Sequence, residues 1–196
     1  MARSDASHTV AYLLIEVPAK KSGDVARRLV DEFRQYVVET HAVWGESDVV
    51  AKVSVPNPGA LAELVMGDIQ KLTFVTGTRT FITIEDMHYQ TEPTTEPGTD
   101  NIDAFVFINV DAARSEEIAK FLVSEFPDNV METYAVWGGA DVIARITAKN
   151  MNELSELIMS AMQNVRYVSV TRTYLIVPGL SEYSKSVKQT VYENKP

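Results

Sequence analysis

The chain has 196 residues with 45% hydrophobic and 23% charged side chains and a net charge of −9, a balance that is ordinary for a soluble globular protein and unfavourable for binding a nucleic-acid backbone. It contains no cysteine, which excludes disulfides, thiolate metal sites and a cysteine nucleophile. The N-terminal residues lack the apolar stretch of a signal peptide, and no apolar run reaches membrane-spanning length. We therefore expect a cytoplasmic protein that contacts no membrane.

The first part of the chain predicts alternating strands and helices. Strands are expected at residues 10–17, 37–44, 48–55 and 72–84. Ser22 is expected to cap the first helix, and Asn57, which precedes Pro58, the second. The short segment at 45–47 predicts a hairpin between the second and third strands.

A second copy of this pattern follows in the same chain. Residues 39–49, ETHAVWGESDV, return as residues 132–142, ETYAVWGGADV, at an offset of about 93 residues. Thr78-Arg79-Thr80 returns as Thr171-Arg172-Thr173 at the same offset. Residues 11–84 align with 104–177 without a gap, and roughly 30 of about 74 positions are identical. The sequence therefore predicts a duplicated domain.

The second copy predicts the same elements in the same order. Its first strand is expected at residues 105–110, Ser115 is expected to cap its first helix, and Asn150 with Glu153 resembles a capping box before its second. The order β-α-β-β-α-β predicts an α+β protein of two tandem ferredoxin-like domains with antiparallel sheets. Helices would cover one face of each sheet, and the other face would need a partner, so we expect pairing of the dimeric α+β barrel type.

The domain limits follow from the repeats and from turn-forming residues. We expect a first domain at residues 8–86, a polar, proline-rich linker at 87–101, a second domain at 102–178 and a C-terminal tail at 179–196. Pro178-Gly179 is expected to end the last strand.

The motif Trp-Gly-x-x-Asp-Val, the strand carrying Thr-Arg-Thr, and the Pro127 to Val130 stretch of the second copy resemble the effector-binding (RAM) domain of the Lrp/AsnC regulators. The resemblance implies amino-acid-like ligands at interfaces between dimers, and a chain equivalent to a pseudo-dimer that assembles into homo-oligomers. It also implies full-length regulators of the family as partners. Only about nine residues precede the first strand, fewer than a helix-turn-helix domain needs, so we expect no direct contact with DNA.

Residues of the hairpins are the first candidates for a site. Gly45 and Gly138 are expected to serve turn geometry or to let backbone groups approach a ligand. Asp48 and Asp141 can receive a ligand ammonium group or close the turn through a hydrogen bond. Both interpretations remain open from the sequence.

The last strand of each copy supplies further candidates. The side chains of Thr78 and Thr80, like those of Thr171 and Thr173, are expected to share one face and either line a polar pocket or reflect β-propensity. Arg79 and Arg172 can hold a ligand carboxylate, but pairing with Glu39 and Glu132 is favoured. Trp44 and Trp137 are expected in the core or an interface.

Our hypothesis is a non-enzymatic, ligand-sensing regulatory protein that uses no cofactor and no metal. The histidines show no metal-ligand spacing, and we find no nucleophile or phosphate-binding motif. Two alternatives remain: a dimeric α+β barrel enzyme of monooxygenase type, and a structural module that co-assembles with full-length regulators. The copies differ at Glu46-Ser47 against Gly139-Ala140 and at Gly77 against Val170, so any pockets are expected to be non-equivalent.

Overall fold

The computed structural model describes residues 8–91, 101–111 and 113–184 of the chain. They divide into two compact units, the first comprising the described residues of 8–82 and 177–184 and the second those of 83–176. The strand order is β4-β1-β3-β2-β8 in the first unit and β8-β5-β7-β6-β4 in the second. Both sheets are antiparallel, as the sequence predicts.

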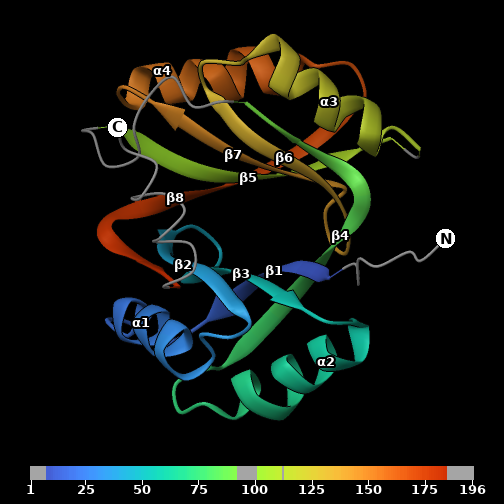
Figure 1. Cartoon of the computed structure of the whole chain (residues 1–196). Helices are drawn as coiled ribbons and strands as arrows, with labels where there is room; N and C mark the ends of the chain where they lie inside the picture. Colours follow the sequence, from blue (N-terminus) through green and yellow to red (C-terminus); the bar gives the residue numbers. More distant parts are fainter. Residues whose placement is uncertain (1–7, 92–100, 112, 185–196) are drawn as a thin grey trace, which may run out of the picture. The chain divides into compact units, whose positions relative to one another are not determined.

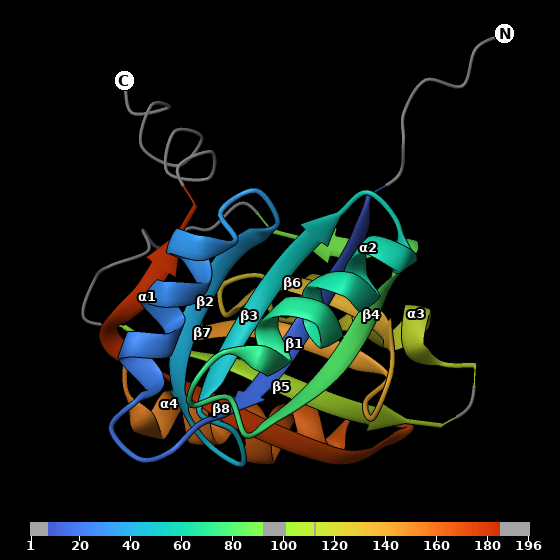
Figure 2. The same cartoon turned by 90° about the horizontal axis from the view of Figure 1, so that it is seen from below.

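The first unit has the expected order of elements. Its members are β1 (Thr9–Glu16), α1 (Ser22–Glu32), β2 (Val37–Trp44), β3 (Val49–Val55), α2 (Pro58–Ala62) with its π-helical and 3-10 continuations η1 (Glu63–Asp68) and η2 (Ile69–Lys71), and β4 (Gly77–Gln90). Helices α1 and α2 lie across the same face of β1, β2 and β3 (Figures 1 and 2).

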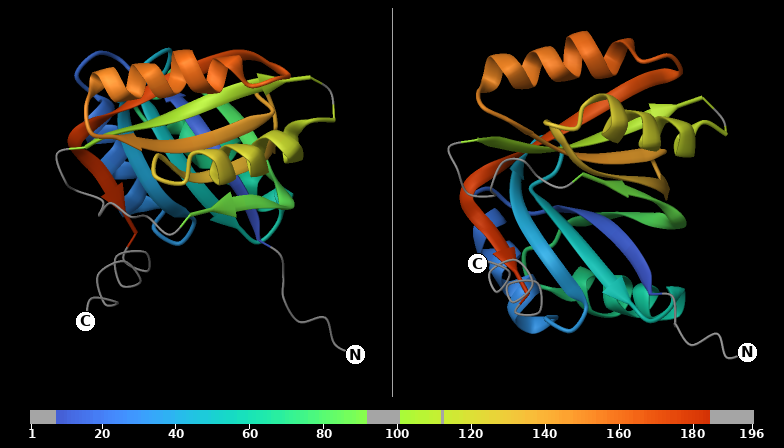
Figure 3. Two further views of the ribbon diagram at one scale, coloured as in Figure 1. Left: turned by 90° about the horizontal axis from the view of Figure 1, so that it is seen from above. Right: turned by 45° about the horizontal axis from the view of Figure 1, so that its top comes forward.

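The second unit repeats this arrangement. Its members are β5 (Ile102–Val110), α3 (Ser115–Glu125), β6 (Val130–Trp137), β7 (Val142–Ala148), α4 (Met151–Ser155) with the continuations η3 (Glu156–Ala161) and η4 (Met162–Asn164), and β8 (Val168–Tyr183). Helices α3 and α4 cover one face of β5, β6 and β7 (Figure 3). The predicted α+β class with two tandem ferredoxin-like units is confirmed.

Each unit has its own hydrophobic core between the helices and the sheet. Apolar side chains at helical spacing in α1 and α3, such as Leu29 and Leu122, are fully buried against alternate residues of the strands. Two buried threonines add a polar tie. The hydroxyl of Thr40 donates to the carbonyl of Ala26 at 2.8 Å, and that of Thr133 donates to Ala119 at 2.9 Å. These bonds fix each first helix on its second strand.

The predicted helix caps are half right. Asn57 Oδ1 accepts from the backbone N–H of Ala60, and Asn150 Oδ1 accepts from Glu153, so both asparagine caps are confirmed. Ser22 and Ser115 are the first residues of their helices rather than caps. Lys21 and Arg114 occupy the cap positions and make no side-chain cap bond, so the serine predictions are wrong.

The last strand of each repeat extends beyond its predicted end. Strand β4 begins at Gly77 rather than residue 72, and it continues to Gln90 with its final residues inside the second unit. Strand β8 runs through Pro178-Gly179 to Tyr183, and its final residues lie inside the first unit. Pro178-Gly179 therefore does not end the strand. The segments 92–100 of the expected linker and 185–196 of the expected tail lie outside the described residues.

Two hydrogen bonds show that these extensions are equivalent in the two units. The backbone N–H of Thr91 donates to the carbonyl of Met131 at 3.0 Å, and Ser184 donates to Val38 at 2.9 Å. Ser184 is equivalent to Thr91, and Val38 is equivalent to Met131, because each pair is separated by the repeat offset of 93 residues. Each sheet thus receives a fifth strand segment from the other repeat. No helix in the described part of the chain is long and apolar enough to cross a membrane.

Candidate ligand site at the hairpin ends

The hairpin of the first unit is held to the end of β1 by an aspartate. Asp48 Oδ2 accepts from the backbone N–H of Val17 at 2.9 Å, and the backbone N–H of Asp48 donates to the carbonyl of Ile15 at 3.1 Å. The carboxylate therefore satisfies a backbone donor beyond the end of β1, and its expected function of receiving a ligand ammonium group stays a prediction. The bond to Val17 fixes the position of the loop against the neighbouring strand.

Arg79 meets this loop from β4. Its Nη2 donates to Ser47 Oγ at 2.9 Å and to the carbonyl of Glu46 at 3.3 Å. Its guanidinium also lies 3.5 Å from Glu16 Oε1 and 3.9 Å from Glu46 Oε2. The expected pairing of Arg79 with Glu39 is wrong, because the register opposes Glu16 to Gly77 and so places the Glu16 side chain beside Arg79.

The equivalent end of the second unit keeps the aspartate and changes its neighbours. Asp141 Oδ2 accepts from the backbone N–H of Val110 at 3.0 Å. Arg172 Nη1 donates to Asn109 Oδ1 at 2.8 Å, and Asn109 Nδ2 donates to the carbonyl of Gly139 at 3.2 Å. A neutral amide thus stands where the first unit has Glu16, and a glycine where it has Glu46. The predicted difference between the copies is present at this end of the sheet.

The predicted threonines lie apart from the hairpins. Gln70 Nε2 donates to Thr78 Oγ1 at 2.7 Å, and Gln163 Nε2 donates to Thr171 Oγ1 at 2.8 Å. Each glutamine comes from the end of a helical segment, so these hydroxyls face the helices. Thr80 and Thr173, two residues further along, are half-buried on the same faces. The predicted residues therefore do not form a single cluster.

The hairpin glycines and tryptophans are exposed. Gly138 has a φ of 151°, whereas the φ of Gly45 is not positive. A backbone conformation that favours glycine is therefore present in the second hairpin and absent from the first. The side chains of Trp44 and Trp137 are 62% and 65% exposed. A core position is therefore wrong for both, and an interface position stays a prediction.

Buried polar groups lie on the sheet of each unit away from the hairpins. In the first unit, His41 is 1% exposed and its Nε2 lies 3.3 Å from Glu39 Oε2. Its Nδ1 lies 2.8 Å from Ser181 Oγ on the extension of β8. In the second unit, Tyr134 takes the place of His41, donates to Glu132 Oε2 at 2.9 Å and stacks on the His88 ring at 4.1 Å.

The sequence analysis did not predict that Glu16, Glu46 and Ser47 contact Arg79. A signal was available, because Glu16 ends the first strand and the hairpin loop lies at the same end of an antiparallel sheet. In residues 8–91, 101–111 and 113–184, no group of three or more His, Asp or Glu side chains is arranged to hold a metal ion.

The model of the Lrp/AsnC ligand binding domain matches the chain twice, over residues 10–93 and 103–190. The chain belongs to this family. The two matches correspond to the two repeats and include the extensions of β4 and β8 as far as the structure describes them. Among curated proteins, none shows significant sequence similarity to this tandem Lrp/AsnC chain.

Some solved structures share the fold of this Lrp/AsnC protein over most of its length, and others match a smaller part of it. An anthrone oxidase-like protein is 15% identical with a TM-score of 0.55, and the match covers 95% of this chain and 97% of that one. The siroheme decarboxylase NirDL is 11% identical with a TM-score of 0.62, covering 96% and 79% respectively. TTHA0845 from Thermus thermophilus is 29% identical over 39% of this chain and 92% of its own, with a TM-score of 0.36.

Proposed function

We propose that the protein is a non-enzymatic regulatory protein that senses an amino acid or a closely related small zwitterion. Membership of the Lrp/AsnC ligand binding family supports a ligand-sensing function. The ligand class is supported by the hairpin end of the first unit, which combines one guanidinium with two carboxylates. We assign the site to Arg79, Glu16 and Glu46.

The charges at this end match those of an amino acid. The side chains of Arg79, Glu16 and Glu46 are 43%, 48% and 62% exposed, so a ligand can reach all of them. Their mutual distances of 3.5 and 3.9 Å are long for charge-assisted bonds, and exposed pairs of this kind contribute little to stability. A ligand carboxylate can therefore displace them from Arg79, while its ammonium group pairs with the freed glutamates.

The second unit provides a matched control. Asn109 and Gly139 replace the two glutamates there, so the same end lacks the two carboxylates to which we assign the ammonium group. We expect one working site per chain, in the first unit. Because Lrp/AsnC domains are expected to bind ligands where dimers meet, binding should also shift the assembly state, which requires unequal affinity for the two states.

The test is a thermal-shift screen against the L-amino acids, followed by calorimetry on any that bind. Ligand at 100 times its Kd stabilises the protein by about 2.7 kcal/mol, which raises the Tm of a chain of this size by roughly 5–10 °C. Arg79→Gln should abolish the shift, and Arg172→Gln should retain it. A flat screen, or equal loss in both variants, would contradict the proposal. Light scattering with and without ligand then measures the change in assembly.

An enzyme is the second candidate, and one observation favours it. His41 lies between Glu39 and Ser181, and a buried imidazole in contact with a carboxylate can act as a general base. A structure of the same fold belongs to a siroheme decarboxylase. Haem-like absorbance of the purified chain that disappears in His41→Gln would favour this candidate. Co-purification with a full-length Lrp/AsnC regulator, together with a flat screen, would instead favour a co-assembly module.

A further inference from the structure

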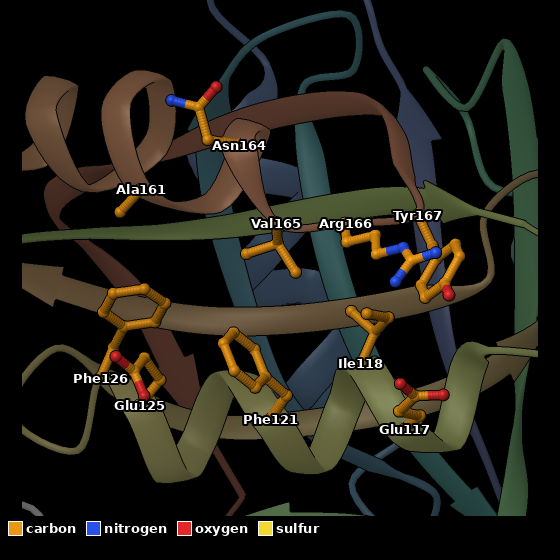
Figure 4. Close-up of a pocket in the computed structure, with 10 residues that line it drawn as sticks. All are labelled: Glu117, Ile118, Phe121, Glu125, Phe126, Ala161, Asn164, Val165, Arg166 and Tyr167. Atoms are coloured by element: carbon orange, nitrogen blue, oxygen red, sulfur yellow. The ribbon is translucent and has the colours of Figure 1, made fainter.

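The helical face of the second unit contains a cavity of about 430 Å³ (Figure 4). It lies between α3 and residues 161–167, which include η4 and the turn that follows it. This volume lies in the range of small-molecule sites. Apolar side chains lining it are Ile118, Phe121, Phe126, Ala161 and Val165, and the polar ones are Glu117, Glu125, Asn164, Arg166 and Tyr167. The cavity lies within one unit and uses no residue of the hairpin ends.

Phe121 is the least expected residue in this cavity. It is 39% exposed on α3, although its neighbours Ile118 and Leu122 are buried in the core. An exposed phenylalanine beside partly buried Phe126 and Val165 leaves apolar surface in contact with water. Covering that surface with a hydrocarbon group would be favourable.

Of the two acids that line the cavity, Glu117 lies toward the end that holds Arg166, and Glu125 lies at the opposite end (Figure 4). Arg166 and Tyr167 lie at one end, and Glu125 and Phe126 lie at the other (Figure 4). The guanidinium carbon of Arg166 is 4.7 Å from the centroid of the Tyr167 ring. Within the described part of the chain, Arg166 has no ion-pair partner. Glu117, the nearer acid on α3, is already paired with Arg114.

The first unit shares the backbone of this region with the second unit but differs from it in some of the side chains that line the cavity. The turn after the second helical segment is shared, because Phe74 and Tyr167 have φ values of 82° and 75°. Glu125 and Phe126 are also shared, as Glu32 and Phe33, but Phe121 and Arg166 are not. Phe121 corresponds to Arg28, which forms an ion pair with Glu32. Arg166 corresponds to Thr73. The combination of an exposed aromatic ring and an available guanidinium therefore occurs in the second unit.

We propose that this cavity binds a small amphipathic carboxylate, such as an aryl-alkanoic acid. Its carboxylate pairs with Arg166, and its hydrocarbon part covers Phe121 and Val165. Glu125 repels an anion from the opposite end and so sets the direction of binding. This is a second site, distinct from the amino-acid site proposed at the hairpin of the first unit, and it takes a ligand that needs no ammonium group.

Calorimetry with 4-phenylbutyrate and its neutral amide tests the proposal on the full chain. The carboxylate should bind roughly tenfold more tightly than the amide, since a hydrogen bond to a charged group contributes more than a neutral one. Arg166→Gln should remove this difference. Phe121→Arg, which installs the residue of the first unit at an exposed position, should abolish binding of both compounds. Arg28→Gln is the matched control and should change neither affinity.

Several outcomes would overturn the proposal. Equal affinity for acid and amide would exclude pairing with Arg166, and unchanged binding by Phe121→Arg would place the ligand elsewhere. Absence of binding at millimolar concentration would exclude the ligand class. A loss of affinity in Glu125→Gln would mean that the opposite end receives the ligand. Arg79→Gln should leave 4-phenylbutyrate binding intact, so this proposal and that of the amino-acid site fail independently.

Discussion

The carboxylates of Asp48 and Asp141 should be structural: their removal should destabilise each unit, and neither carboxylate should contact the ligand directly. Asp48 accepts from the N–H of Val17 at 2.9 Å, and Val17 is 8% exposed. Leaving a buried donor without its acceptor costs about 1–3 kcal/mol. Asp48 itself is half-buried, so water can replace part of the bond. We therefore expect Asp48→Ala to lower the free energy of unfolding by about 1–2 kcal/mol.

The neutral substitution refines this expectation. Asp48→Asn keeps an oxygen acceptor, and neutral hydrogen bonds are about half as strong as charge-assisted ones, so it should lose about half as much as Asp48→Ala. Asp141→Ala should lose somewhat less, because Val110 is less buried than Val17.

Urea denaturation followed by tryptophan fluorescence suits this measurement, since Trp44 and Trp137 adjoin the two hairpins. Asp31→Ala, at an exposed position of α1, is the control and should change stability by less than about 0.5 kcal/mol. If Asp48→Ala were as stable as the parent, or Asp48→Asn as damaged as Asp48→Ala, the structural reasoning would be refuted. Loss of amino-acid binding in a fully stable Asp48→Asn would assign the carboxylate to the ligand.

Three further predictions concern the scaffold. Thr133→Val should cost about 1 kcal/mol, measured by the urea midpoint, because it removes the bond to Ala119 and keeps the volume. Leu122→Ala should cost about 2–5 kcal/mol, because it leaves a cavity in a fully buried position. The side-chain amide of Asn129 and the backbone N–H of Lys149 hold the pKa of Glu153 below its usual value of 4.5. The stabilisation by this carboxylate is therefore fully present above pH 4.5 and is lost as the pH falls through the lowered pKa. The difference in unfolding free energy between the parent and Glu153→Gln, measured by urea denaturation at several pH values, should therefore shrink in acid. A difference that does not change with pH would contradict this prediction.

The sequence predicted the scaffold well because its signals are local and doubled. Strand β2 was expected at residues 37–44 and lies there, since apolar, β-branched residues extend along it to the loop that begins at Gly45. The duplication supplied the order of elements twice. Sister domains with the same order must satisfy the same packing constraints, so each copy supported the assignment of the other.

The C-terminal ends of β4 and β8 could not be predicted from the similarity between the repeats. Identity between the repeats fades after residues 84 and 177, yet equivalent bonds continue to Thr91 and Ser184. Strand pairing uses backbone N–H and C=O groups that every residue except proline supplies in full. The side chains are therefore free to diverge while the ladder persists. Pro178 is tolerated within β8 despite lacking a donor, which is why a turn signal at 178–179 was misleading.

The residues that differ between the units are the ones that carry the proposed sites. The aspartate that holds each hairpin and the glutamine that holds each Thr78-type hydroxyl are the same in both repeats. Glu16 against Asn109 and Phe121 against Arg28 are not. A duplicated fold that keeps its internal contacts can change its exposed positions at little cost in stability. Each unit is therefore the natural control for the other, and a binding difference between Arg79→Gln and Arg172→Gln reports the ligand site rather than the fold.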